Sequence, residues 1–191
     1  MKETPRVSRV VTKTGDGGKT SLTTGERVCK RHHVVKAIGE VDELNCWIGT
    51  IYGDISRPGV GGIPGCAELN RIQHILFDIG GVLSGGEMSP RISEATEELT
   101  QSIADMNQTL SPLREFVLPG GNIHIARAIC RRVERSILDL KYNRTVPPKF
   151  GEMFKQKRLP VIGAFLNRLS DWLFVFARTQ GIGPEPVWEH M

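Results

Sequence analysis

The sequence has no apolar run that approaches the length of a membrane span, so we expect no transmembrane segment and no membrane partner. It has no run of Lys and Arg interleaved with aromatic residues, and aromatics make up only 6% of the chain, which argues against a nucleic-acid partner. It also lacks a C-x-x-C pair, which argues against a zinc site and for a reducing compartment. Its four cysteines are widely spaced, at Cys29, Cys46, Cys66 and Cys130.

The N-terminus lacks the apolar core of a secretory signal and, unlike most transit peptides, carries an early acidic residue, Glu3. We therefore expect a cytoplasmic protein, or a protein of the mitochondrial matrix if the source is eukaryotic. The 25 Lys and Arg residues outnumber the 21 Asp and Glu residues, giving a net charge of +4. This mildly basic balance suits an anionic small molecule.

A length of 191 residues predicts a single domain with a sizeable core over 1–191, and we find no internal repeat. Residues 1–31 are polar and glycine-rich, with a short β-like piece at 7–11. Residues 32–180 have a helical apolar period, and 181–191 form a tail without an assigned role. Four predicted helices span about 33–53, 65–84, 122–142 and 160–180. A further helix, the third in order, begins near Ser89 as N-cap and Pro90 as first residue, and its apolar stripe runs from Ile92 to Met106. The sequence thus predicts an all-α, five-helix bundle.

The fourth predicted helix places Arg127, Arg131 and Arg135 at i, i+4 and i+8, with Glu134 beside them. Its opposite face is apolar and consists of Ile125, Ile129, Val133, Ile137 and Leu140. A row of guanidinium groups is typical of a site for a multivalent anion, although a solvated helix face explains the same pattern.

A glycine-rich stretch, Thr12 to Thr20, precedes the helices. Glycines allow several backbone N–H groups to point at one anion, and lysines and hydroxyls add charge and donors. Its Gly-Lys-Thr ending resembles a P-loop, but Lys13 occupies the position of the first glycine and no βαβ pattern follows. A flexible turn cluster is the alternative; together with the arginine helix and Lys30, the stretch is better explained as a phosphate cradle.

Polar pairs also interrupt two apolar helices. Asp42 and Asn45 flank the apolar stripe of the first helix, where they form either a solvated face or a site at which Asp42 orients an arginine. Asn167 and Asp171 are spaced i, i+4 on the last helix and favour a buried polar network and a ligand contact about equally.

Phe116 lies in the Phe-Val-Leu-Pro-Gly-Gly segment that leads into the arginine helix. A large aromatic residue here is either a core plug or a pocket wall, and the residue pattern alone favours the plug.

Six ordered stretches together resemble the PduO-type ATP:cob(I)alamin adenosyltransferases. They are TKTGDGGKTSLTTGERVCK at 12–30, AIGEVDELNCWIG at 37–49, RIQHILFDIGGVLS at 71–84, FVLPGG at 116–121, HIARAICRRVER at 124–135 and FLNRLSDWLFVFAR at 165–178. The resemblance implies a five-helix bundle that assembles as a homotrimer with sites between subunits. It implies transfer of the 5′-deoxyadenosyl group of ATP to the cobalt of cob(I)alamin, which gives adenosylcobalamin and triphosphate.

The resemblance also implies the roles of individual residues. The ATP-binding positions are Thr12, Lys13, Thr14, Gly15, Thr20, Lys30, Arg131, Arg132, Glu134, Arg135 and Asn167, with Asp171 in support. Asp42 and Arg127 would form an intersubunit ion pair. Phe116 would help displace the lower axial ligand of cobalamin, which replaces the plug interpretation, and we count Arg131, Arg127, Asp42 and Phe116 as catalytic.

The implied cofactors are ATP as co-substrate and Mg²⁺ carried on its phosphates, with cobalamin as substrate. A reductase and an adenosylcobalamin-dependent mutase are the expected partners. Two alternatives remain open at this point. One is a non-catalytic carrier or sensor of ATP and corrinoid on the same bundle, and the other is a structural bundle whose arginine face binds an acidic partner surface.

Overall fold

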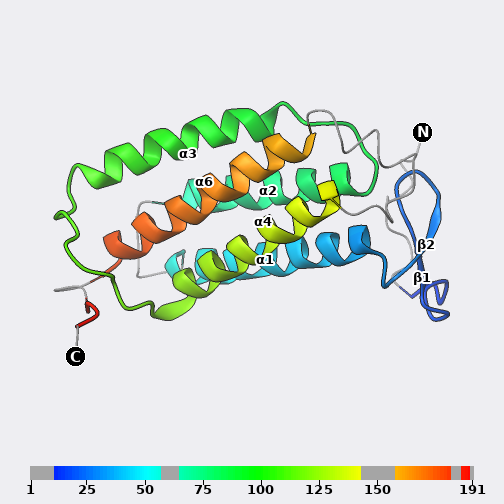
Figure 1. Cartoon of the computed structure of the whole chain (residues 1–191), viewed down its shortest axis with the longest axis horizontal. Helices are drawn as coiled ribbons and strands as arrows, with labels where there is room; N and C mark the ends of the chain where they lie inside the picture. The colour runs from blue at the N-terminus through cyan, green and yellow to red at the C-terminus, as the bar shows by residue number, and fades with distance from the viewer. Residues whose placement is uncertain (1–10, 57–64, 143–157, 182–185, 190–191) are drawn as a thin grey trace.

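Five helices and a short β-hairpin make up the computed structural model, which describes residues 11–56, 65–142, 158–181 and 186–189 (Figure 1). The elements are β1 (Lys19–Ser21), β2 (Arg27–Cys29), α1 (His33–Ile55), α2 (Cys66–Leu83), α3 (Arg91–Asn107), α4 (Gly121–Tyr142) and α6 (Arg158–Thr179). The predicted all-α five-helix bundle is confirmed, and the predicted helix bounds agree to within two residues. Of the β-like piece expected at 7–11, residues 7–10 lie outside the described residues, and Val11 is not in a strand.

The core is built around α6, which packs against both α3 and α4. Three of its aromatic residues, Phe165, Trp172 and Phe176, are the largest fully buried side chains. The Trp172 and Phe176 rings stack with centroids 4.6 Å apart, and the indole N–H of Trp172 donates to Ser102 Oγ at 3.0 Å on α3. The buried indole thus has a hydrogen-bond acceptor, as such a group requires.

The expectation that no stretch approaches membrane-span length was wrong for α6. This helix has 22 residues, and its most apolar 18-residue window has a mean hydropathy of 1.3, so its length and composition would allow it to cross a membrane. In the bundle, however, 61% of its most apolar window is buried. Its hydropathy is explained by a core position, where a helix is covered on most sides.

One residue of the predicted apolar face of α4 is misplaced. Ile129, Val133, Ile137 and Leu140 are buried as expected, but Ile125 is 42% exposed. At 100° per residue, Ile125 lies about a quarter turn from the centre of the buried face, beyond the reach of the neighbouring helices.

The predicted capping of α3 was also wrong. The helix begins at Arg91 with Pro90 as its N-cap residue, and no side chain caps it. The Ser89 hydroxyl instead donates to Asp78 Oδ2 of α2 at 2.9 Å, and Asp78 also pairs with Arg91 at 3.4 Å. Ser89 therefore links the start of α3 to α2. A hydrogen bond to a charged carboxylate is stronger than one to a neutral backbone group, which favours this arrangement over helix capping.

Helices α1 and α4 pack antiparallel, which decides where the two halves of the site lie. Asn122 at the start of α4 donates to Asp54 at the end of α1, at 2.9 Å. The 23 residues of α1 span about 35 Å, since each residue rises about 1.5 Å. The starts of α1 and α4 therefore lie at opposite ends of the bundle (Figure 1).

The β-hairpin that precedes α1 was not predicted. Strands β1 and β2 pair antiparallel, with Thr20 opposite Val28. Val28 and Leu22 are buried and fasten the hairpin to the core. At its tip, the Thr23 hydroxyl donates to the Ser84 carbonyl at 2.6 Å and the Thr23 N–H donates to the Ser84 hydroxyl at 2.9 Å. The hairpin is thus attached to both the core and the end of α2.

Candidate functional site

The glycine-rich stretch folds into a tight loop over the hairpin. The Asp16 N–H donates to the Lys13 carbonyl at 3.3 Å, and the Gly18 N–H donates to the Gly15 carbonyl at 3.2 Å. Lys13 has a φ of 58°, in the left-handed region that a residue with a side chain rarely adopts. Among the described residues it is the one non-glycine with a positive φ. Such strain concentrates at functional loops, and here it falls within the predicted phosphate cradle.

Lys30 lies directly over this loop. Its N–H donates to the Gly18 carbonyl at 2.9 Å, and its Nζ would be 3.2 Å from a side-chain carbon at Gly15. A side chain at position 15 would therefore crowd the Lys30 ammonium group. The fold therefore brings Lys30 together with Gly15, as the cradle hypothesis requires.

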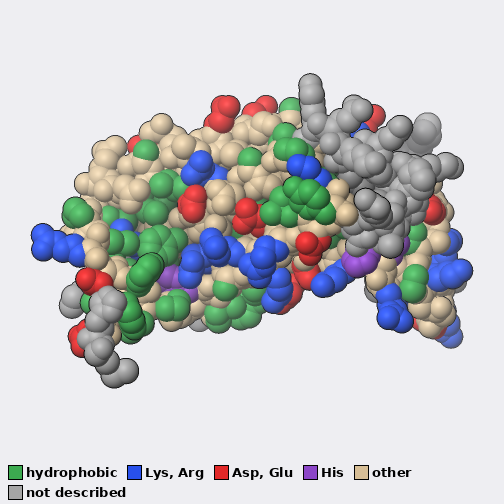
Figure 2. Space-filling model, in the orientation of Figure 1, with side chains coloured by type: hydrophobic (Ala, Val, Ile, Leu, Met, Phe, Trp, Pro, Cys, Tyr) green, Lys and Arg blue, Asp and Glu red, His purple; other side chains and the backbone are tan. Residues whose placement is uncertain are grey.

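The middle of α4 carries the predicted arginine row, and Figure 2 shows a band of Lys and Arg side chains over this helix. Arg131 and Arg135 are exposed. Arg132 is not free in the same way, because its guanidinium pairs with the carboxylate of Glu43 on α1. Both partners of that pair are more than 40% exposed, so its contribution to stability is small, about 0–1 kcal/mol.

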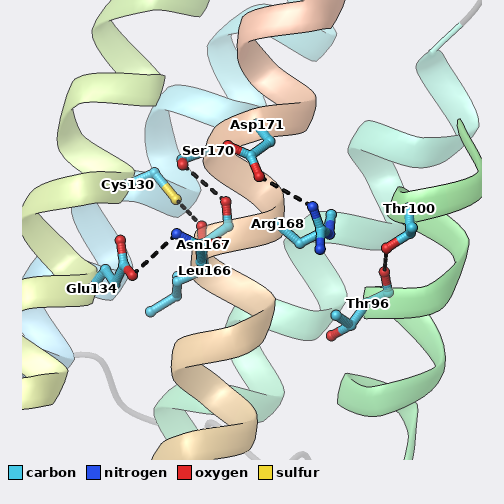
Figure 3. Close-up of polar contacts among 9 residues, drawn as sticks. All are labelled: Thr96, Thr100, Cys130, Glu134, Leu166, Asn167, Arg168, Ser170 and Asp171. Carbon is cyan, nitrogen blue, oxygen red and sulfur yellow. Dashed lines mark hydrogen bonds and ion pairs between the residues drawn. The ribbon is translucent and has the colours of Figure 1, made fainter. Parts of the chain in front are cut away.

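The polar residues of α6 lie on more than one side of the helix, and Asn167 points toward Glu134 of α4 (Figure 3). The Asn167 amide donates to Glu134 Oε1 at 3.5 Å, and Arg168 donates to Asp171 Oδ2 at 3.2 Å. Asn167 and Asp171 are both exposed, so within one chain they do not form the buried network that was one of the two sequence interpretations. Asn167 and Glu134 thus form an open polar edge beside the arginine row.

The two polar residues of α1 have different surroundings. Asn45 is buried, donates to the Gln73 carbonyl at 3.4 Å, and accepts at its own carbonyl from the Gln73 amide at 3.3 Å. It is therefore a structural link between α1 and α2. Asp42 is exposed.

A cavity of about 440 Å³ lies at the opposite end of the bundle from the hairpin. Its lining consists of Leu113, Arg114, Glu115, Phe116, Val117, Arg127 and Phe174. Phe116 is 78% exposed, which excludes the core-plug interpretation within one chain. The Arg127 guanidinium carbon lies 5.7 Å from the centre of the Phe174 ring, a cation–π geometry. The Arg127 Nε is buried and has no hydrogen-bond partner among the described residues.

The structure therefore divides the predicted site residues into groups that do not meet within one chain. Thr12, Lys13, Thr14, Gly15, Thr20 and Lys30 lie at the hairpin end. Phe116 and Arg127 lie at the other end, and Asp42, Arg131, Arg132, Glu134, Arg135, Asn167 and Asp171 lie between them. Asp42 directly precedes Glu43 on α1, and Glu43 pairs with Arg132 on α4. Arg132 lies five residues, or about 7.5 Å along the helix axis, from Arg127.

Comparison with known proteins places this arrangement in a family. A family model described as cobalamin adenosyltransferase matches residues 10–180. The chain belongs to the cobalamin adenosyltransferase family. A cobalamin adenosyltransferase of Cupriavidus metallidurans is 38% identical over 96% of this chain and 96% of its own length. The human corrinoid adenosyltransferase MMAB is 35% identical over 92% of this chain and 70% of its own length.

A solved structure agrees with the fold. A variant PduO-type ATP:corrinoid adenosyltransferase from Lactobacillus reuteri, complexed with cobalamin and ATP, aligns with a TM-score of 0.78. It is 28% identical, and the alignment covers 95% of this chain and all of that one. The resemblance inferred from six sequence stretches is thus confirmed over nearly the whole chain.

Two residues of this family member's site were not found by sequence reasoning. Arg27 on β2 donates to the Thr14 carbonyl at 2.7 Å and so holds the glycine loop, but an isolated arginine in a polar segment gave no signal. Phe174 lies against Arg127, and its spacing of seven residues from Asn167 could have revealed it. Positions i and i+7 share a helix face, so Phe174 continues the polar face of α6 rather than its core stripe.

Metal binding by protein side chains alone has no support among the described residues. No group of three His, Cys, Asp or Glu side chains there is placed to hold a metal ion. Glu134, beside the arginine row on α4, and Asn167, which donates to it, offer side-chain oxygens there. Such donors suit Mg²⁺, which is usually bound by one or two carboxylates together with substrate phosphates.

Proposed function

We propose that this family member transfers the 5′-deoxyadenosyl group of ATP to the cobalt of cob(I)alamin and releases triphosphate. The observation that carries the proposal is the family match over residues 10–180, which includes every predicted site residue. Two relatives that align over more than 90% of this chain are named as a cobalamin and a corrinoid adenosyltransferase.

The chemistry places particular demands on the site. Co(I) is itself the nucleophile that attacks the 5′ carbon, so no general base is needed. The leaving group is a triphosphate, and its charge must be stabilised as it develops. We assign this role to Lys30 over the glycine loop and to Arg131 and Arg135, whose exposed guanidinium groups are available to an anion. Arg132 can join them only by leaving Glu43.

Magnesium would enter with the nucleotide. When bound, Mg²⁺ neutralises part of the charge on the phosphates. We propose that it is held mainly by the phosphate oxygens, with Glu134 on the same helix as the arginine row as a protein carboxylate ligand. The remaining ATP contacts are assigned to Thr12, Lys13, Thr14, Gly15, Thr20 and Asn167, with Asp171 supporting them.

We further propose that the working form is a homotrimer with sites between subunits. The support is the distance between the starts of α1 and α4, about 35 Å, which keeps Lys30 of one chain away from its own Phe116. A neighbouring copy can bring its Phe116 end beside the hairpin of the first. In this assembly Asp42 of one subunit pairs with Arg127 of the next, where the buried Arg127 Nε lacks a hydrogen-bond partner among the described residues.

Phe116 is assigned to the corrin. It stands exposed at the cavity that Arg127 and Phe174 also line. An aromatic ring in this position would help displace the lower axial ligand of the cobalt by occupying the space beneath the corrin, without itself binding the metal. Losing that ligand makes the reduction of Co(II) to Co(I) easier.

The partners and compartment follow from this chemistry. A reductase must supply Co(I), and an adenosylcobalamin-dependent mutase would use the product. We propose a reducing compartment, the cytoplasm or the mitochondrial matrix, in keeping with the four cysteines, all of which are free thiols.

The deciding experiment is an anaerobic assay with ATP, Mg²⁺ and chemically reduced cobalamin, in which loss of the Co(I) spectrum and appearance of adenosylcobalamin are followed. We expect stoichiometric product and triphosphate. Binding of both substrates without product would overturn the transferase and identify a carrier or sensor. Absence of an ATP-dependent thermal shift would point to a structural bundle, since a ligand at 100 times its Kd adds about 2.7 kcal/mol.

A further inference from the structure

The segment that carries Phe116 pairs with the C-terminal tail of the chain. The Trp188 N–H donates to the Phe116 carbonyl at 2.8 Å, and the Leu118 N–H donates to the Pro186 carbonyl at 2.8 Å. Val117 and Val187 face each other between these two bonds in an antiparallel bridge. Residues 116–118 and 186–188 thus form a minimal two-stranded ladder, separated by about 70 residues of sequence.

This ladder is the main described support of the Phe116 backbone. Phe116 is 78% exposed and Leu118 47% exposed, so burial of these two side chains contributes little to fixing the segment, although Val117 between them is half-buried. Nearer α3, Arg178 of α6 donates to the Ser111 carbonyl at 2.8 Å and anchors the start of the loop. Between Ser111 and the start of α4 at Gly121, the described backbone hydrogen bonds are the two to the tail.

We propose that the tail strand, residues 186–188, is a positioning element for Phe116, and that it acts through backbone pairing rather than through the Trp188 ring. This inference rests on the proposed function, because the purpose of the positioned ring is the corrin side of the reaction. The ladder fixes the position of the Phe116 backbone at the mouth of the cavity that Arg127 and Phe174 line. Without the ladder, the Phe116 ring samples many positions, and each binding event must offset the conformational entropy lost when the ring is ordered.

Backbone pairing makes a specific prediction about position 188. Proline has no N–H, so Trp188→Pro removes the bond to the Phe116 carbonyl. Trp188→Ala keeps the N–H and removes only the ring. The two variants therefore separate strand pairing from a side-chain contact, and deletion of residues 186–191 removes both.

The first measurement is amide hydrogen exchange on the ligand-free protein, read at Leu118. We expect exchange at this amide to be at least about tenfold faster in the deletion variant and faster in Trp188→Pro, with Trp188→Ala close to wild type. Unchanged exchange in the deletion variant would overturn the proposal. Equal acceleration in Trp188→Ala and Trp188→Pro would also overturn it, because the ring would then be the anchor. Unchanged amides in α4 and α6 serve as the control for folding.

The second measurement is steady-state kinetics. We expect the KM for cobalamin to rise several-fold in the deletion variant and in Trp188→Pro, while the KM for ATP stays within about twofold. Faster exchange at Leu118 with unchanged cobalamin kinetics would show that the ladder does not position Phe116 for the reaction. If the wild-type protein forms no adenosylcobalamin, the proposed function fails, while the exchange result still reports separately on the ladder.

Discussion

The two ends of the bundle differ in their chemical character. At the hairpin end, backbone groups, a strained Lys13 and an overlying Lys30 form a polar loop that Arg27 holds from the side. At the other end, Phe116, Phe174 and a half-buried Arg127 line a cavity. The first suits a compact polyanion and the second a large, flat, partly apolar molecule. In the proposed trimer, each end meets its counterpart from a neighbouring copy, because the length of α1 separates the two ends within one chain.

Mixing two inactive variants is the strongest test of this separation. Lys30→Ala removes a cation from the anion cradle, and Phe116→Ala removes the ring at the opposite end. We expect each variant alone to lose about 100-fold or more in kcat/KM. Differently tagged chains, co-expressed and purified through both tags, should recover about a third of the wild-type activity, because one interface in each mixed trimer carries both intact groups.

Two variants from the same end provide the control for that mixture. Lys30→Ala combined with Lys13→Ala leaves each interface with a damaged hairpin, so activity should not return. Recovery in this pair, or none in the first, would contradict a site shared between opposite ends of two copies.

The role of the arginine row between the two ends can be tested by comparing an arginine that has an acidic partner with one that is exposed. Arg131 is exposed, whereas Arg132 pairs with Glu43. We expect Arg131→Ala to lower kcat/KM for ATP by about 100-fold with little change in the midpoint of thermal unfolding. Arg132→Ala should lose less activity and cost at most about 1 kcal/mol of stability. Equal kinetic losses would mean that Arg132 leaves Glu43 and binds the nucleotide as well.

A milder substitution at the cavity should separate the two substrates. Arg127→Lys keeps the charge but loses the planar group that lies over Phe174. We expect a several-fold rise in the KM for cobalamin and an unchanged thermal shift with ATP. Titrating ATP and cobalamin separately against this variant provides the measurement, and a weakened response to ATP would contradict the assignment of the two ends.

The smallest effect concerns the thiols. Cys29 is exposed next to Lys30, while Cys130 is buried and its thiol donates to the Leu166 carbonyl at 3.2 Å. Burial, with a smaller contribution from the Glu134 carboxylate, raises the pKa of the Cys130 thiol, so it stays protonated and unreactive at pH 8. Peptide mass spectrometry after alkylation should show fast labelling of Cys29, slowed several-fold by ATP but not by cobalamin. Cys130 should be labelled only after unfolding.

Much of the fold was predictable because its helices are amphipathic. Regular apolar spacing located all five helices, since the bundle forms chiefly by burying one apolar face of each helix. Ile125 was misassigned because periodicity shows the direction of the buried face but not its width. The width is set by the neighbouring helices. The hairpin was missed because strands of three residues carry too little alternation to compete with a run of glycines.

The residues of the candidate site could be proposed from the sequence, whereas their arrangement in space could not. Helical spacing grouped Arg127, Arg131 and Arg135, and the resemblance supplied their expected roles. The separation of Lys30 from Phe116 follows from the antiparallel packing of α1 and α4, which no local pattern records. The pairing of residues 116–118 with 186–188 was missed for the same reason, because backbone hydrogen bonds between distant segments leave no signature in side-chain types.

The position of α6 in the core has a consequence for the synthesis of the chain. Three of its aromatic residues are the largest fully buried side chains, and it is the last of the described helices in chain order, so it leaves the ribosome after the other four. Until it emerges, the apolar surfaces of α3 and α4 that pack against it stay exposed, and exposed apolar surface of this kind promotes aggregation. A nonsense mutation before residue 158 therefore yields an aggregation-prone fragment instead of a weakened enzyme, even though most of the predicted site residues precede it.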